Sequence, residues 1–257
     1  MLGKFKDKDF EAIRNSALSR QTPSNLAGAF IISIPLLWLM YFLVFYVAGD
    51  ATGDVTNYPL FSEMMLICFW ISIALTVFMV LFTIRVIYMK FQKIQYLVGI
   101  GLSHALFGGG TYLAALFIIG KSDKVSADVL IKITLISLST MVIILLVTVI
   151  RFITLLNKGA YRRGTAKDVQ RTKFEGYSYV PIVVIASTGF VITLQIIISN
   201  YDFEGLNQLI VIVIGFLVAH VMSFVLPEQL VILYCKYRFK SFNFDNRGKL
   251  YYIEDDH

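Results

Sequence analysis

The chain has 257 residues, of which 57% are hydrophobic and only 16% are charged, and its formal net charge is +6. Soluble domains carry about 25% charged residues, so this composition argues against an ordinary soluble domain and favours a protein of the lipid bilayer. The basic surplus is divided among separate segments, which argues against nucleic-acid binding.

Six apolar stretches are long enough to cross a bilayer, because a hydrocarbon core of about 30 Å requires roughly 20 helical residues. The polar N-terminal tail before the first stretch lacks the features of a cleavable signal peptide. Pro227 lies in the sixth stretch, where it removes a backbone donor and favours a kink. The predicted spans are 26–48, 60–84, 96–120, 129–150, 179–199 and 209–235.

These spans predict an all-α, polytopic membrane protein. Its expected parts are a cytoplasmic N-terminal tail at 1–25, a six-helix transmembrane domain at 26–235 and a cytoplasmic C-terminal tail at 236–257. Apolar residues at helical spacing in the basic N-terminal tail favour a short interfacial helix against anionic lipid. Alternating aromatic and polar residues in 241–253 predict a small β-hairpin or a docked strand.

The distribution of Lys and Arg predicts the orientation of the spans. All of these residues except Lys121, Lys124 and Lys132 fall in the tails or in segments that six spans would place on one side. Basic residues accumulate on the cytoplasmic side of membrane proteins. Both termini are therefore predicted to be cytoplasmic, with short outer loops, and the expected location is the cell (plasma) membrane.

Two tryptophans fall near the middle of predicted spans rather than at the interface, where indole rings are enriched. A buried indole N–H requires a hydrogen-bond partner. We therefore expect Trp38 and Trp70 to pack between the first and second spans.

The third span is rich in small residues. Gly101, Ala105 and Gly109 recur at four-residue spacing and would line one helix face, where small residues allow close helix packing. The consecutive glycines Gly108, Gly109 and Gly110 each cost about 1 kcal/mol of helix propensity relative to Ala. Close packing is the simpler interpretation. The alternative is a helix break at these glycines, as in many transporters.

Ionisable residues inside the predicted spans are the candidate functional groups, because such residues are costly in lipid. His104 and Glu228 lie at similar predicted depths, and His220 lies on a helix face similar to that of Glu228. Beside the Pro227 kink, the three residues could relay protons or bind a cation. In the simpler alternative each histidine is neutral and bonded to a nearby hydroxyl, while Glu228 extends toward the inner surface.

The sequence contains no H-E-x-x-H, G-x-S-x-G or P-loop pattern, so it predicts neither an enzyme nor a cofactor. Cys68 and Cys235 fall at different predicted depths, whereas a disulfide requires Cα atoms within about 7 Å. We therefore expect two free thiols and no metal site.

Three functions are compatible with this pattern. Short loops, polar tails and sparse intramembrane charge favour a non-enzymatic protein that binds another membrane protein or a second copy of itself. An accessory subunit, an assembly factor and a toxin-immunity protein belong to this class. The second hypothesis is a transport subunit. The third is a small ion- or proton-coupled carrier that uses His104, His220 and Glu228, although no inverted repeat is evident.

In length, span number and inward termini the chain resembles permeases of ATP-driven exporters of the ABC-2 type. This resemblance concerns topology and implies a transport role beside a separate ATPase. The segment between the fifth and sixth spans is too short for the re-entrant helices expected in such permeases. The excess of Ile over Ala, with frequent Lys, Phe and Asn, is typical of bacteria with low-GC genomes.

Overall fold

The computed structural model describes residues 2–14, 21–53, 55–122, 124–166, 168–169 and 206–252. This part of the chain is helical and contains no strand, which confirms the predicted class. Five of its helical segments are long and apolar enough to cross a membrane. They coincide with the predicted spans one to four and six, while the predicted fifth span at 179–199 lies outside the described residues.

The long helices have local signals at their ends. The first span begins at the N-cap Thr22, whose hydroxyl accepts a hydrogen bond from the Asn25 N–H, and Pro23 occupies the first helical turn. The third span is one helix of 29 residues whose middle is π-helical. In chain order the spans are α2 (Pro23–Phe42) with the π-helical η3 (Leu43–Ala48), α3 (Phe61–Leu81), α5 (Gln92–Ser103) with the π-helical η4 (His104–Gly110) and α6 (Thr111–Gly120), α7 (Ala127–Asn157), and α10 (Leu206–Arg238).

Shorter helices lie at the chain ends and between two spans. The 3₁₀ helices η1 (Leu2–Lys4) and η2 (Asp7–Phe10) precede the first span, and η5 (Lys240–Phe242) follows the last. The helix α4 (Arg85–Lys90) connects α3 to α5. An isolated antiparallel bridge between Phe244 and Leu250 closes a turn in the C-terminal segment, which is less pairing than the predicted hairpin requires.

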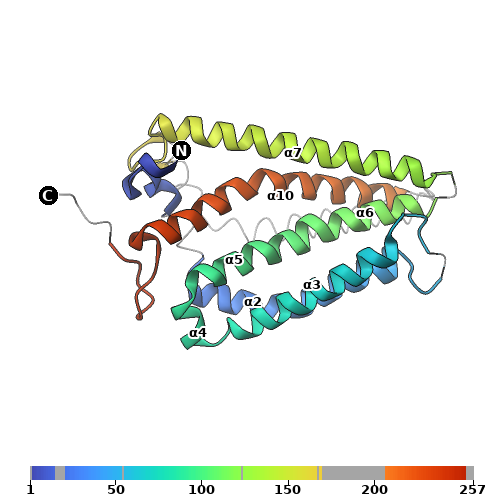
Figure 1. Ribbon diagram of the computed structural model, residues 1–257, viewed down its shortest axis with the longest axis horizontal. Coiled ribbons are helices and arrows are strands. Elements are labelled where there is room, and N and C mark those ends of the chain that lie inside the picture. Colours follow the sequence, from blue (N-terminus) through green and yellow to red (C-terminus); the bar gives the residue numbers. More distant parts are fainter. Residues whose placement is uncertain are drawn as a thin grey trace.

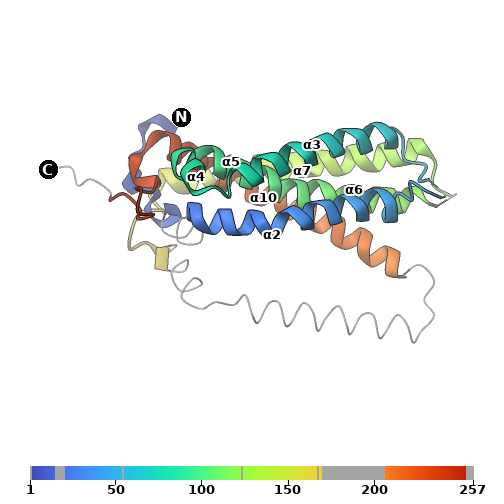
Figure 2. The same ribbon diagram turned by 90° about the horizontal axis from the view of Figure 1, so that it is seen from below.

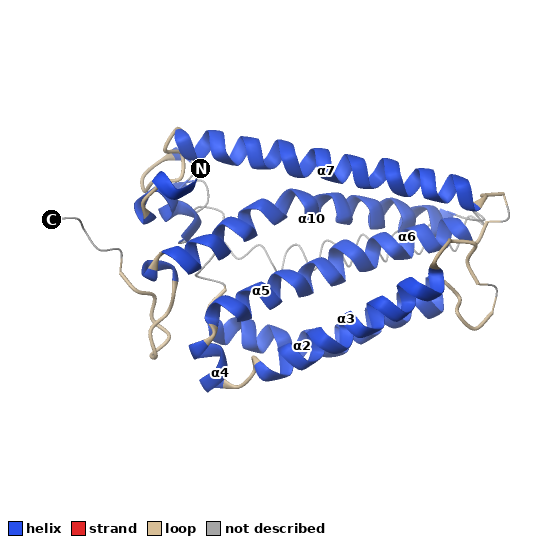
Figure 3. Cartoon of the chain, in the orientation of Figure 1, coloured by secondary structure: helices blue, strands red, loops and turns tan. Residues whose placement is uncertain are grey.

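The helices run side by side along the long axis of the molecule, and the connections gather at its two ends (Figure 1, Figure 3). The helix α10 packs against both α6 and α7, and α2 packs against α3. The N- and C-terminal segments lie at the same end of the bundle, as the view in Figure 2 also shows.

Large apolar side chains cover the outside of the bundle. Ile136 on α7 is 66% exposed and Ile32 on α2 is 72% exposed. A soluble monomer rarely exposes contiguous apolar surface on this scale. The outer surface therefore fits a lipid environment, in agreement with the predicted membrane class.

The two tryptophans behave differently. The Trp38 indole donates a hydrogen bond to the Thr76 hydroxyl of α3 at 3.1 Å, which confirms that it packs between the first two spans. Trp70 is 60% exposed on α3, so the corresponding prediction for this residue is wrong. Trp70 lies on a side of α3 that the rest of the chain leaves exposed.

Candidate functional site

His104 begins the π-helical segment η4. Its Nδ1 lies 3.0 Å from the Ile100 carbonyl oxygen, and because a carbonyl only accepts, Nδ1 carries the proton. The other ring nitrogen, Nε2, is buried and has no hydrogen-bond partner among the described residues. His104 thus presents an unpaired acceptor inside the bundle.

His220 lies on α10 and links it to α7. Its Nδ1 lies 2.6 Å from the Phe216 carbonyl oxygen, and its Nε2 lies 2.9 Å from the Thr140 hydroxyl. Both ring nitrogens therefore have partners, of the kind expected for a neutral membrane histidine.

Glu228 follows Pro227 inside α10, and the helix continues through both residues. The carboxyl group of Glu228 lies close enough to the buried Tyr96 of α5 for an electrostatic interaction. His104 bonds within its own helix, His220 bonds to α7, and Glu228 approaches Tyr96. The contacts that the structure gives for the three predicted residues thus go to different neighbours.

The small residues of the third span face several helices. A Cβ at Gly101 would lie 3.7 Å from Leu75 of α3, and one at Gly108 would lie 3.7 Å from Met222 of α10. A Cβ at Gly110 would lie 2.9 Å from Met40 of α2.

At Gly109, by contrast, a Cβ would meet only the His104 carbonyl oxygen of the same helix. The backbone stays helical through the glycines but widens to a π-helix. π-Helices are rare in proteins, and those that do occur often lie at functional sites.

A cavity of about 180 Å³ lies between α2, α3 and this π-helical segment. Ala105, Gly109 and Gly110 line it together with Ser72 and apolar side chains. The glycines thus leave space on one side of the third span. The cavity is mostly apolar, and none of the three predicted ionisable residues lines it.

The most extensive structured site lies at the end of the bundle that holds both chain ends. We call residues 2–14, 158–166 and 239–252 the terminal cap. Its apolar side chains share one buried cluster with the adjoining ends of α5, α7 and α10. Phe10, Ile13 and Phe242 in this cluster have no exposed surface. The N-terminal apolar residues are therefore covered by protein.

Arg14 joins the two chain ends. Its Nε donates to the Ser241 carbonyl oxygen and its guanidinium also donates to the Tyr251 carbonyl oxygen, both at 2.7 Å. Burial lowers the pKa of Arg14 from its ordinary value, and the carboxylates of Glu11 and Asp7 oppose this shift. The guanidinium remains charged in proteins, so both charge-assisted bonds persist at physiological pH.

Gln92 fastens the C-terminal segment to the start of α5. Its amide Nε2 donates to the Phe244 carbonyl oxygen at 2.8 Å, and its Oε1 accepts from the Phe244 N–H at 2.9 Å. One side chain therefore satisfies both backbone groups of a buried residue.

Lys236 is 2% exposed at the end of α10, although lysine is almost never fully buried without a partner. Its ammonium donates to the Phe242 carbonyl oxygen at 3.2 Å and lies over the rings of Tyr96 and Phe244. The sequence predicted this residue only as one of many basic residues near the membrane.

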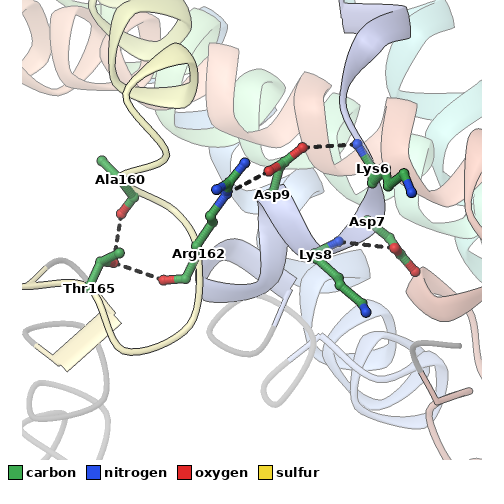
Figure 4. A network of polar contacts seen from close by, with 7 residues as sticks. All are labelled: Lys6, Asp7, Lys8, Asp9, Ala160, Arg162 and Thr165. Carbon is green, nitrogen blue, oxygen red and sulfur yellow. Dashed lines mark hydrogen bonds and ion pairs between the residues drawn. The ribbon is translucent and has the colours of Figure 1, made fainter. Parts of the chain in front are cut away.

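The turn after α7 completes the terminal cap. Arg162 Nε donates to the Asp9 carboxylate at 2.8 Å, and the other oxygen of that carboxylate accepts from the Lys6 N–H (Figure 4). The Ala12 N–H bonds to the Tyr161 carbonyl oxygen at 2.9 Å. The N-terminal segment is therefore held from two directions, by the α7 turn and by the C-terminal segment.

These contacts can hold a shaped surface at this end of the bundle. No group of three or more metal-ligating side chains occurs among the described residues. Cys68 and Cys235 are both free thiols, as expected. Comparisons with protein families, curated proteins and solved structures find no match to this chain.

Proposed function

We propose that this protein is a non-enzymatic multi-pass membrane protein that acts by binding another membrane protein through its terminal cap. The observation that carries the proposal is the Arg14 guanidinium, which joins segments more than 200 residues apart by one buried and one partly buried hydrogen bond. Ordering a chain costs about 1–2 kcal/mol per residue, and tails that only follow a membrane span do not require such ordering. A surface that binds a partner does require its residues to be ordered.

The orientation of the bundle supports this role. The terminal cap lies at the end where the described basic residues are concentrated, and the positive-inside rule assigns that end to the cytoplasm. We propose a cytoplasmic N-terminus and C-terminus in the plasma membrane of a bacterium. The partner surface would then face the cytoplasm beside the membrane.

Site-specific photo-crosslinking in intact cells tests the proposal. A photoreactive residue at Tyr252, which is 92% exposed in the terminal cap, should form a crosslink with one membrane protein. Gln92→Glu places a carboxylate against the Phe244 carbonyl and should release the C-terminal segment and abolish the crosslink. Gln208→Glu, at the exposed opposite end of α10, is the matched control and should leave it intact.

Two results would contradict the proposal. In one, crosslinks form only from a mid-membrane position such as Ile136 on α7, which would move the partner surface to the helices. In the other, the Tyr252 crosslink survives Gln92→Glu at full yield. In that case the folded cap would not be what the partner recognises.

A carrier is the second candidate, because the His104 Nε2, which has no partner among the described residues, lies in a π-helical segment. A small proton-coupled carrier would use this acceptor together with Glu228, and proton flux into proteoliposomes would then be lost in both His104→Leu and Glu228→Gln. An ABC-2-like export permease rests only on the chain length, the predicted span number and the predicted inward termini.

A further inference from the structure

A pocket of about 530 Å³ lies where the α4–α5 junction faces the end of α10. This volume falls within the usual range of ligand sites, about 300–1,000 Å³. Five of its twelve lining residues are basic, and none is acidic. These basic residues are Lys90, Lys93, Lys236, Arg238 and Lys240.

Two basic side chains of the pocket lie over aromatic rings. The Lys93 ammonium lies over the Tyr237 ring at 5.0 Å, and the Lys240 ammonium lies over the Tyr251 ring at 4.8 Å. Among the described residues neither lysine, nor Lys90, pairs with an acidic side chain. Their charge is therefore available to an anion.

The backbone adds a second, independent feature. The helix α5 begins at Gln92 within the pocket lining, and the N–H groups of Gln92 and Lys93 have no acceptor among the described residues. The first N–H groups of a helix are free donors, and the helix dipole adds partial positive charge there. Together with lysines, such a helix end forms a phosphate-binding arrangement.

The side chains around the pocket indicate which kind of phosphate group would bind there. Exposed apolar side chains border it: Phe91 is 44% exposed, Ile94 39% and Tyr237 56%. Aromatic rings of this kind are enriched at the headgroup level of a bilayer. Basic pockets between transmembrane helices on the cytoplasmic side bind anionic lipid headgroups.

We infer that this pocket binds the phosphate of an anionic phospholipid headgroup, with Lys93 and Lys240 as the accessible charges and the α5 N-terminus as a backbone donor. The inference goes beyond the proposed partner binding. It is tested on the purified full-length protein, so it can fail or hold independently of any partner.

Native mass spectrometry of the detergent-purified protein measures the binding. Short-chain phosphatidylglycerol should bind more tightly than short-chain phosphatidylcholine. Lys93→Ala/Lys240→Ala should weaken phosphatidylglycerol binding by about thirtyfold, from the usual contribution of a lysine near an anionic surface. Lys158→Ala/Arg163→Ala removes the same charge from exposed positions outside the pocket and should weaken it by less than about threefold.

The unfolding midpoint without added lipid shows whether the variants fold. Lys90→Gln/Lys240→Gln changes two exposed side chains and serves as a second pocket variant if the first is unstable. Equal weakening in the pocket and control variants would overturn the inference, and so would equal binding of the two lipids. Binding of inorganic phosphate and of glycerol 3-phosphate is measured in the same way. If either binds as tightly as phosphatidylglycerol, the lipid source is overturned and a soluble phosphate is the ligand.

Discussion

Gly215 of α10 lies directly against the Thr111 backbone of α6. A Cβ at position 215 would lie 2.6 Å from the Thr111 carbonyl oxygen and 2.9 Å from the Ala115 side chain. The Thr111 hydroxyl in turn lies 3.4 Å from the Gly215 carbonyl oxygen. Such close approach is how membrane helices gain packing energy without a hydrophobic drive between them.

Gly215→Ala should therefore destabilise the bundle. The nearest atom is backbone and cannot move aside, so α6 and α10 must separate, at a cost of about 1–3 kcal/mol. Unfolding in mixed micelles with increasing dodecyl sulfate measures the change. Gly28→Ala in α2 is the control, because a Cβ there meets nothing within 4 Å. Equal effects of the two substitutions would show that the helices do not touch at Gly215.

Arg14→Lys should loosen the terminal cap although it keeps the charge. A lysine ammonium does not reproduce the guanidinium fork that reaches Ser241 and Tyr251. Losing one hydrogen bond to a charged group costs about 1.5–3 kcal/mol. Amide hydrogen exchange within 240–252 should then accelerate by about tenfold or more. The exposed Arg163→Lys should leave exchange unchanged, and unchanged exchange in Arg14→Lys would contradict the described contacts.

His104→Leu should not lower the free energy of unfolding. The substitution removes a buried acceptor that has no partner among the described residues and that costs about 1–3 kcal/mol. This gain exceeds the loss of the Nδ1 bond to the Ile100 carbonyl oxygen, at about 0.6 kcal/mol. His220→Leu breaks the contact with Thr140 and should cost about 0.6 kcal/mol, the average for a membrane hydrogen bond. The same unfolding measurement compares the two. A larger loss for His104→Leu would mean that Nε2 has a partner in the working protein.

Reporter fusions test the proposed orientation. Fusions at Gly53 and Ser126, in the loops far from the terminal cap, should be external. Fusions at Phe91 and Thr165, at the end that holds the cap, should be internal. A neighbouring pair with reversed activity would show that the positive-inside assignment fails.

The spans were predictable because hydropathy is a property of consecutive residues. Five of the six stretches appear as helices of sufficient length and apolarity, and the predicted fifth span at 179–199 lies outside the described residues. The same reasoning succeeded for Trp38 but failed for Trp70. Depth along a helix follows from the sequence, whereas the direction in which a residue faces depends on which helices pack together.

Contacts between distant segments were not predictable for the same reason. Gly215, Ala219 and Ser223 recur at four-residue spacing, as Gly101 and Ala105 do, but such spacing does not show which helix the face meets. Arg14 and Gln92 bond to backbone carbonyl and N–H groups, which every residue type carries. The distribution of basic residues predicted the topology. The folded chain is needed to show which of those basic residues are buried.

The arrangement of the terminal cap has a consequence for biosynthesis. Arg14 is synthesised before the described spans, but its partners Ser241 and Tyr251 follow α10 in the chain. Phe10 and Ile13 remain without their full cover until the final span has been inserted. A chain truncated before residue 240 would lack Phe242 and Phe244 and would leave Phe10 and Ile13 with less apolar cover. Completion of the cap therefore requires synthesis of the chain on both sides of the described spans.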